Sequence, residues 1–489
     1  MTTSTRPLLV ALLGLLSVAE CFASHIVAGE ISYRHDAGSN NPFTYDITLT
    51  LYRDTQGVDQ PNAFLYFGVD GANSTVQVVS RDRVGTPVGN GLERLGYTFK
   101  YTYPGPGSYI VSFTEENRNA GIVNMFQSVN TAFHLEAQVV VSTALRGNGS
   151  PRLLNPPIFH AFVGQKVCIN PAAYDAEGDS LSYRLVAPLA KSGSPVTSYQ
   201  SPHLVAPPGT SESGGAPTLT LNALTGDICW DAPGARRRDG GVISAPTDFA
   251  QYAVAFVVEE WRNGVKIGST MRDFALFVTA PRAPKPELRA ENAAGAGFDA
   301  DRLVRAEPGR PVTFSVLYKA SEAGRDSLRP VSETFLLARN ASATTADSAG
   351  FVKVTYRWTP TEAERRNHPY VIVFRGESGD ALRNDLTFGV FVGADIPTGQ
   401  VTATEDEVNG RKIRLFPNPT RNKVRLAGVP GTGAVYFRLT NALGREVYAS
   451  PNLRSTNPEV DLSALPNGLY AYTITTGQRV VGKGRLLKR

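Results

Sequence analysis

Short runs of β-forming residues, separated by turn-forming residues, recur along almost the whole chain. Examples are residues 45–52 (YDITLTLY), 109–113 (YIVSF), 252–258 (YAVAFVV) and 388–392 (FGVFV), each close to Gly, Pro, Asn or Asp. Strands are enriched in β-branched and aromatic residues, whereas an amphipathic helix needs apolar residues three and four apart over several turns. Convincing helical stretches are absent after the first two dozen residues. The pattern predicts an all-β protein made of β-sandwich modules.

Length and charge narrow the classes of protein that this sequence can encode. The chain has 489 residues, enough for several domains, and 42% of them are hydrophobic, which is ample for packed cores. The net charge is only +5, and the basic residues are scattered. The densest basic run, Arg236, Arg237 and Arg238, stands beside two glycines, which is typical of a solvated loop. We therefore expect no nucleic-acid partner.

The N-terminus has the layout of a secretory signal peptide. Arg6 precedes an apolar run at 8–19, and the small residues Ala23 and Ser24 follow it. The apolar run is too short to span a bilayer comfortably. We expect residues 1–24 to be a signal peptide read by the Sec translocon and cleaved at Ala23 or Ser24.

Two cysteines remain after that leader, Cys168 and Cys229, and both lie in strand-like surroundings. In an oxidising compartment the simplest expectation is that they form one disulfide. The alternative is a pair of buried free thiols in neighbouring strands.

An internal repeat indicates three related modules. Residues 107–121, 251–264 and 369–379 each combine a strand beginning near a tyrosine with an acidic turn. A short tryptophan-containing motif precedes each of the last two copies, at 229–233 and 357–360. We place β-sandwich modules at 25–145, 150–281 and 284–395, a linker at 396–411 and a last domain at 412–489.

The last segment carries a set of ordered motifs. Its members are Pro417, Asn418, Pro419, Gly444, Leu465, Pro466, Gly468, Tyr470, Gly482 and Lys483. In this order and spacing they resemble the type A sorting domain of proteins exported by the type IX (Por) secretion system. The resemblance implies a small β-sandwich, passage across the outer membrane, removal by a sortase-like peptidase and, often, attachment to surface lipopolysaccharide. The alternative is a terminal β domain with no sorting role.

Other segments of the sequence resemble those of surface proteins of gliding bacteria, which carry cadherin-like or PKD-like immunoglobulin modules. They occupy 24–33, 45–54, 175–183, 226–230 and 267–273. This resemblance implies tandem immunoglobulin-like sandwiches and a surface location, without an assigned activity.

The turn containing Asp175, Glu177 and Asp179 is the candidate metal site. Alternate acidic residues around a glycine can direct carboxylate oxygens onto Ca²⁺. Cadherin-like modules use similar turns, sometimes with a glutamate from a neighbouring strand, a role open to Glu259 or Glu260. The alternative is an ordinary Asp-Gly turn between two strands. We expect no cofactor other than calcium.

Catalytic signatures are scarce, and we expect a protein that is not an enzyme. The sequence lacks HExxH, GxSxG and P-loop motifs, and its six histidines are dispersed. The adjacent pair Glu259–Glu260 should face opposite sides of its strand, so it cannot flank one glycosidic bond. Trp230 and Trp358 should be core residues, while Trp261 is the better candidate for exposure.

These observations predict a secreted or outer-surface protein of a Gram-negative bacterium, exported by the type IX machinery with its sortase. The passenger is expected to be adhesin-like or structural, with surface polysaccharide or other cells as partners. The alternative is a polysaccharide-binding protein, which would need exposed aromatic residues on one sandwich face. A secreted hydrolase has less support.

Overall fold

The structure is a computed structural model that describes most of the chain between residues 25 and 488. The described residues are 25–69, 76–145, 147–157, 159–205, 212, 216–231, 233–234, 241, 243, 248–262, 265–281, 284–291, 298, 302–319, 326–338, 340–378, 383–393, 407–408, 411–412, 414–416, 420, 422–427, 435–440, 446–450, 453, 459–466, 468–476 and 479–488. Several predicted features lie outside them: Ala23, Ser24, the run at 236–238, Pro417, Asn418, Pro419 and Gly444.

The predicted all-β class is confirmed. In the part of the chain that the structure describes, helices are single short turns. They are η1 (Ser128–Asn130), η2 (Thr143–Leu145), α1 (Pro202–Val205), α2 (Thr334–Leu337) and η3 (Glu362–Glu364). None of the described helices is long and apolar enough to cross a membrane.

One large sheet contains the first eight strands and several later ones. Its main path runs β4-β3-β7-β8-β19-β1-β2-β6-β5, and five further strands attach to it. The path strands are β1 (Ile26–His35), β2 (Thr44–Asp54), β3 (Asn62–Tyr66), β4 (Val76–Ser80), β5 (Thr86–Gly89), β6 (Leu92–Thr102), β7 (Gly107–Glu115), β8 (Phe133–Val141) and β19 (Val265–Thr279). The attached strands are β10 (His160–Phe162), β13 (Ser180–Val186), β14 (Leu189–Lys191), β15 (Ser194–Pro195) and β18 (Phe249–Arg262).

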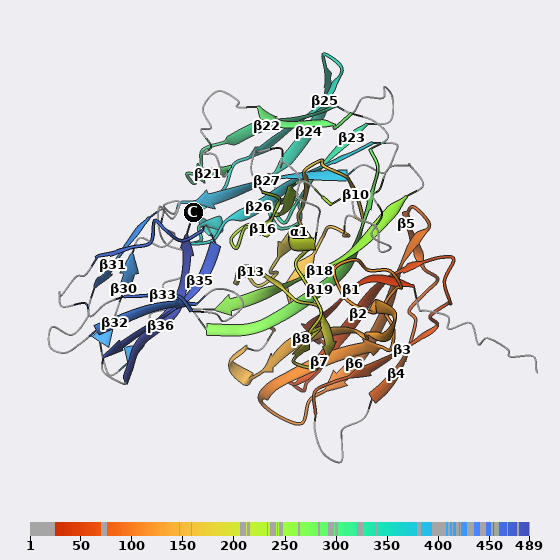
Figure 1. The fold of residues 1–489 in the computed structure, drawn as a ribbon, viewed down its shortest axis with the longest axis horizontal. Coiled ribbons are helices and arrows are strands. Elements are labelled where there is room, and N and C mark those ends of the chain that lie inside the picture. The colour runs from red at the N-terminus through yellow and green to blue at the C-terminus, as the bar shows by residue number, and fades with distance from the viewer. Residues whose placement is uncertain are drawn as a thin grey trace, which may run out of the picture.

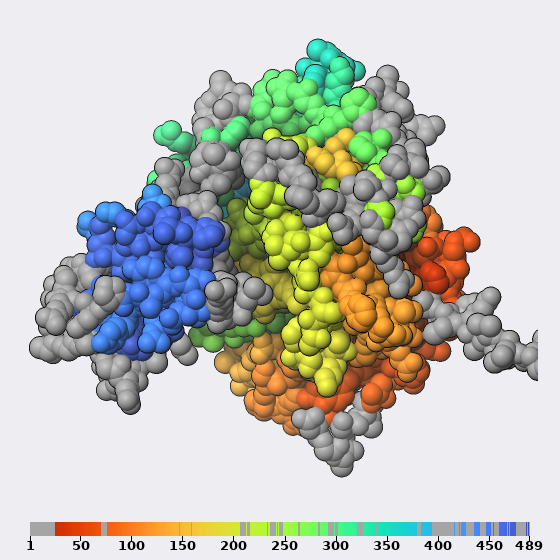
Figure 2. Space-filling view, viewed as in Figure 1, coloured from red at the N-terminus to blue at the C-terminus, as the bar shows by residue number. Residues whose placement is uncertain are grey.

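This sheet crosses the division that the sequence suggested between 145 and 150. Strand β1 pairs with β2 on one side and with β19 on the other. Ile31 belongs to the core of the first module, whereas its neighbours Val27 and Ala28 pack in the core of the second. Figure 2 shows the surfaces of the two parts in direct contact. The first two modules therefore share one sheet and two adjoining cores.

The second module is completed by small sheets. They are formed by β11 (Val167–Ile169), β17 (Ile228–Asp231) and β16 (Thr218–Leu221), and by β9 (Arg152–Leu153) with β12 (Ala173–Tyr174).

The third module is a two-sheet sandwich, drawn in green to cyan in Figure 1. One sheet has the order β20 (Glu287–Glu291), β22 (Val312–Lys319), β25 (Phe351–Trp358) and β24 (Ser342–Ser348). The other has the order β21 (Leu303–Ala306), β27 (Arg383–Val392), β26 (Tyr370–Glu377) and β23 (Ser327–Ser332).

The internal repeat corresponds to a shared local structure in the second and third modules. The hairpins β18–β19 and β26–β27 each accept a parallel strand, β10 and β21 respectively. Trp230 stacks edge-on against Tyr252 with ring centroids 4.9 Å apart, and Trp358 packs in the same way on Tyr370 at 4.7 Å. Both tryptophans are buried, as the sequence predicted.

The C-terminal domain is a small sandwich of two sheets, drawn in blue in Figure 1. One contains β30 (Arg414–Phe416), β31 (Lys423–Ala427) and β34 (Glu459–Asp461). The other contains β33 (Glu446–Ala449), β32 (Val435–Thr440), β35 (Gly468–Thr476) and β36 (Arg479–Lys488). A further strand pair, β28 (Glu407–Val408) and β29 (Arg411–Lys412), precedes them. The domain has a core of its own, centred on residues such as Phe437, Leu439 and Ile474.

Candidate metal centre

The acidic turn between β12 and β13 is closed by the side chain of Asp175. Its Oδ1 accepts hydrogen bonds from the backbone N–H groups of Glu177, at 3.0 Å, and Asp179, at 2.9 Å. Gly178 has φ of +86°, a conformation that glycine adopts without the Cβ clash of other residues. The turn therefore buries the carboxyl groups of Asp175 and Asp179 and leaves Glu177 exposed.

A third carboxyl group reaches the turn from β18. Glu260 stands opposite Leu181 of β13, and its side chain lies on the same side as the acidic turn. One oxygen each from Asp175, Asp179 and Glu260 lies within 4.8 Å of the other two. The side chain of Glu260 is fully buried, with 0% exposure. Three carboxyl groups thus meet where bulk water does not reach.

A glycine on the neighbouring strand makes room for this glutamate. Gly268 of β19 is the register partner of Glu260. A Cβ at Gly268 would come within 2.7 Å of Oε2 of Glu260 and would overlap the hydroxyl group of Tyr33. Any larger residue would therefore displace the carboxyl group or the tyrosine.

Two polar side chains, Arg262 and Asn148, form hydrogen bonds with some of these carboxyl oxygens. Arg262 donates to both carboxylate oxygens of Asp179, at 2.8 and 2.6 Å, and to Oδ1 of Asn148 at 2.6 Å. Asn148 donates in turn to Oε1 of Glu260 at 2.8 Å. One guanidinium group therefore faces three carboxyl groups, which leaves an excess of acidic groups.

The remaining oxygens have the features of cation ligands. Among the described residues, Oδ2 of Asp175 and Oε2 of Glu260 are buried and have no hydrogen-bond partner. A separate cavity of about 20 Å³ adjoins the turn; Asp175 and Asp179 line it together with Arg366 and His368 of the third module, whereas Glu260 does not. Each oxygen of Asp179 also keeps a second lone pair beside its bond to Arg262. Because Ca²⁺ is bound by carboxylate oxygens and water, these residues fit a calcium ion.

The pKa values of two of the clustered carboxyl groups, Asp175 and Glu260, are raised, as expected for acidic groups buried close together. Burial, together with the charge of Asp175, raises the pKa of Glu260 to about 9. Burial also raises the pKa of Asp175 to about 7, and the carboxylates of Glu177 and Asp179 contribute in the same direction. Without a cation the cluster therefore holds protons at neutral pH that a bound cation would displace.

The sequence-predicted ligands are only partly assembled. Asp175 and Asp179 are brought together, but Glu177 is not part of the group, and its Oε2 accepts from the backbone N–H of Gly149 at 3.3 Å. Glu260 occupies the third place. Glu259 points to the other face of the strand, where it pairs with Arg184 at 3.2 Å. The two adjacent glutamates therefore face opposite sides, as predicted.

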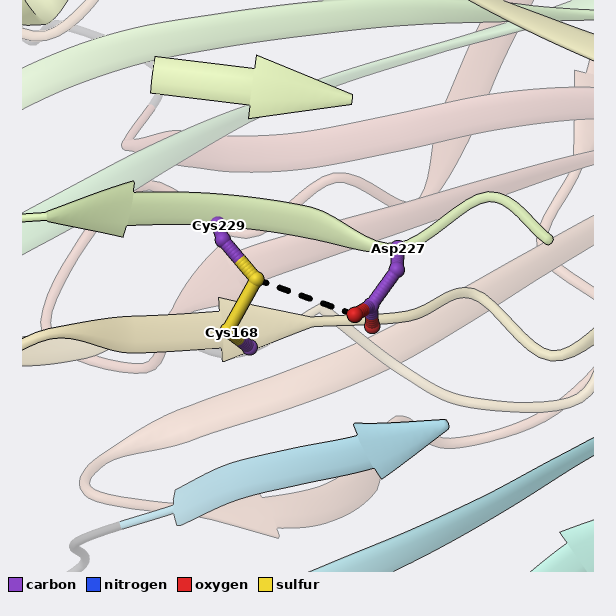
Figure 3. Close-up of side chains that lie close together, drawn as sticks. All are labelled: Cys168, Asp227 and Cys229. Carbon is purple, nitrogen blue, oxygen red and sulfur yellow. Dashed lines mark hydrogen bonds between the residues drawn. A yellow bond between two sulfur atoms is a disulfide. The ribbon is translucent and has the colours of Figure 1, made fainter. Parts of the chain in front are cut away.

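The second acid-containing cluster is built around a disulfide. Cys168 of β11 and Cys229 of β17 stand directly opposite each other and are joined by the predicted bond. Figure 3 shows Asp227 beside them, with its Oδ2 3.7 Å from Sγ of Cys229. Sulfurs in a disulfide are not thiolate ligands, so this cluster is no metal site. Burial raises the pKa of Asp227 to about 6, although its hydrogen bond from Thr387 opposes the shift.

A buried polar network joins the second and third modules beside that disulfide. Arg375 forms a two-pronged ion pair with Asp385, at 2.8 Å for both bonds, and also donates to the carbonyl of Pro156 at 2.9 Å. The backbone N–H of Asn170 donates to the same aspartate at 2.8 Å. The two modules are therefore held by charged hydrogen bonds that bulk water does not reach.

A histidine in the first module forms the hydroxyl–imidazole–carboxyl arrangement that hydrolases use. Nδ1 of His134 is 2.7 Å from Oγ1 of Thr114, and Nε2 is 3.1 Å from Oε1 of Glu136. Glu136 also accepts from the backbone N–H of Gly193 at 3.1 Å, which fastens the β14–β15 turn. The hydrogen bonds of His134 therefore serve to hold this turn in place, and they give no support for a catalytic role.

Trp261, the tryptophan favoured for exposure, is half-buried, and its indole N–H donates to the hydroxyl group of Ser182 at 2.8 Å.

The predicted sorting residues that the structure describes lie on the β35–β36 hairpin and the turn before it. Leu465 packs against the core, and Gly468 begins β35. Tyr470 donates its hydroxyl hydrogen to the carbonyl of Pro466 at 2.6 Å, which fastens the turn to the strand as a tyrosine corner does. Gly482 and Lys483 pair along β36 with Ile474 and Thr473.

Comparison with known families identifies this domain. Residues 414–487 match the family model described as the secretion system C-terminal sorting domain. The chain ends in a type IX sorting domain. This domain supports export to the cell surface or the extracellular space. No curated protein matches this chain.

Solved structures offer only weak likeness. A complex of Dpr2 Ig1-Ig2 with DIP-Theta Ig1-Ig3 is 8% identical, with 74% of this chain and 99% of that chain covered and a TM-score of 0.17. The eight N-terminal Ig domains of Down Syndrome Cell Adhesion Molecule are 10% identical, with coverage of 91% and 47% and a TM-score of 0.17. The BSP domain of a biofilm associated protein is 8% identical, with coverage of 95% and 96% and a TM-score of 0.15.

Proposed function

We propose that this protein is carried by the Sec translocon and then by the type IX machinery to the outer surface or surroundings of a Gram-negative bacterium. There its three modules act without catalysis as an adhesin-like, rigid passenger. The observation that carries the proposal is the sorting domain at 414–487, because a domain of this family marks a chain for export.

Rigidity of the passenger is supported by buried ion pairs across its contacts. Arg272 of β19 forms a two-pronged pair with Glu30 of β1, at 3.0 and 2.9 Å. Arg375 and Asp385 are equally buried where the third module meets the second. A buried charge left without its partner is strongly unfavourable, so the modules resist separation. A rigid passenger suits a protein that presents a binding surface outside the cell.

Fractionation tests the export proposal. The full chain and a form lacking 412–489 are expressed in a host with a type IX system and in the same host without its translocon. We expect the full chain at the surface or in the medium, shortened at both ends by intact mass, and the truncated form in the periplasm. Export that is indifferent to the deletion or to the host would refute the sorting role.

The same passenger is proposed to bind one calcium ion at Asp175, Asp179 and Glu260. The support is the two buried oxygen atoms, Oδ2 of Asp175 and Oε2 of Glu260, that have no hydrogen-bond partner among the described residues. The bound ion would supply positive charge to the acidic cluster and so hold the β12–β13 turn to β18.

A further inference from the structure

A groove of about 680 Å³ runs over the outer face of the first module. Strand β2 lines it with alternate residues, Asp46, Thr48, Thr50 and Tyr52, while the intervening residues point into the core of the first module. This alternation is that of a strand with one face buried. The volume lies within the range of ligand sites, about 300–1,000 Å³.

The groove is long as well as large. Its lining residues come from five strands that are neighbours in the sheet, in the order β19-β1-β2-β6-β5. Neighbouring strands are about 4.8 Å apart, so the groove crosses roughly 19 Å of sheet. Residues 150–154 and Pro156 form its wall. This shape fits a segment of an extended chain better than a small compact molecule.

Hydroxyl groups dominate the floor. Ser32, Thr48 and Thr98 are register partners on three adjacent strands and form a row across it. Thr50 stands beside Gly96, where the carboxylate of Asp82 lies close to the backbone and accepts a hydrogen bond from the hydroxyl group of Thr98 at 2.9 Å. Hydroxyl groups both donate and accept hydrogen bonds, which suits a ligand that itself carries many hydroxyl groups.

The charges of the groove favour an anionic ligand. Its two acidic residues are already paired, Glu30 with Arg272 and Asp46 with Arg34. Arg94 and Arg152 are exposed lining residues, and neither has an ion-pair partner among the residues that the structure describes. Two free guanidinium groups present paired N–H donors that match a carboxylate.

We infer that this groove binds a segment of an acidic polysaccharide, with Arg94 and Arg152 on its carboxylates and the Ser/Thr row on its hydroxyl groups. The inference rests on the proposed surface location and names the ligand class for the passenger. The tyrosines that line the groove, Tyr33 and Tyr52, are buried, so the lining that the structure describes lacks the exposed aromatic face expected of a polysaccharide-binding sandwich, and the saccharide would be held by arginines and hydroxyl groups without ring stacking. The same lack of exposed rings argues against nucleic acid, whose bases stack on them.

The test uses the purified full chain and short polyuronate oligosaccharides, with binding measured by calorimetry. Neutral dextran oligosaccharides, a polyglutamate peptide and an oligodeoxynucleotide are the comparison ligands. R94Q/R152Q removes the two free guanidinium groups. R329Q/R357Q is the matched control, because it removes two exposed arginines of the third module and changes the net charge equally.

We expect polyuronate to bind best, and R94Q/R152Q to weaken it about 100-fold, since each charged hydrogen bond contributes about tenfold. The control should bind within about twofold of wild type at the same ionic strength. The inference is overturned if dextran, the peptide or the oligonucleotide binds as tightly as polyuronate, or if both double variants weaken binding equally. An exported protein that fails to bind polyuronate overturns this inference and leaves the export proposal standing.

Discussion

Replacing Glu260 with glutamine isolates the contribution of one buried carboxyl group. The side chain keeps its size and its acceptor for Asn148, but it loses the ability to ionise. In the folded protein the pKa of Glu260 rises from 4.5 to about 9, mainly through burial. At pH 7 folding therefore forces this group to take up a proton, which costs about 3 kcal/mol. E260Q removes that cost.

The sign of the pH dependence follows from the raised pKa. The folded state binds the proton more tightly than the unfolded chain, so stability is greatest below about pH 4.5 and falls as the pH rises toward 9. Asp175, with a pKa raised to about 7, adds a change of the same sign at lower pH. Calcium reverses this trend, because it binds only the ionised groups and its affinity rises as they lose their protons.

The assay is thermal unfolding from pH 5 to 9, in chelator and in excess calcium. In chelator at pH 7 we expect E260Q to be more stable than wild type by about 3 kcal/mol, or roughly 6–12 °C for a unit of 150–250 residues. Calcium at about 100 times its dissociation constant should stabilise wild type by about 2.7 kcal/mol and E260Q hardly at all. E259Q is the matched control and should keep the full calcium response.

Two results would refute this reasoning. If E260Q responds to calcium as strongly as wild type and E259Q do, Glu260 is not a ligand. If the wild-type unfolding temperature in chelator is unchanged from pH 5 to 9, the buried carboxyl groups do not hold protons. The second result would leave a calcium site open to direct titration, whereas the first would exclude this one.

Three further predictions concern stability. The pair C168S/C229S should lose up to about 4 kcal/mol against urea, because the bond closes a loop with a sequence separation of 61; unchanged urea unfolding relative to wild type would contradict this. Y470F removes the hydrogen bond to the carbonyl four residues upstream and should cost the sorting domain about 1 kcal/mol in calorimetry, with export reduced and passenger melting unchanged. R375M leaves Asp385 buried without its partner and should cost about 3–5 kcal/mol in urea unfolding, whereas R329Q, at an exposed position, should cost less than about 0.5 kcal/mol.

Local patterns predicted the fold class and the repeated core well. The two tryptophan-containing motifs and the tyrosine that begins each later repeat were predicted to occupy equivalent positions in the second and third modules. The matching contacts Trp230–Tyr252 and Trp358–Tyr370 confirm this prediction. Such contacts depend on strand alternation and on residue types that sequence displays directly. The disulfide was predictable because Cys168 and Cys229 are the two cysteines left after the leader and both stand in strand-like surroundings.

The metal cluster could be predicted only in part, because its third member depends on strand register. Asp175 and Asp179 are four residues apart in one turn, whereas Glu260 reaches them through the pairing of β18 with β13. The sequence permits Glu259 or Glu260 in this place, and a shift of one residue would exchange them. Gly268 is the signal that decides between them, since only the glutamate opposite a glycine has room for its carboxyl group.

The composition of β1 gives no indication that the first two modules share one sheet. Its alternation of apolar and polar residues predicts a strand with one face in water. In the structure Glu30 is buried, because Arg272 of β19 neutralises it with two hydrogen bonds. The edge of a strand can therefore pair with a strand of another module that supplies the opposite charge beside a buried carboxylate. Alternation reports on the two faces of a strand and not on the partner at its edge, so the division between residues 145 and 150 was visible as a turn but the continuous sheet was not.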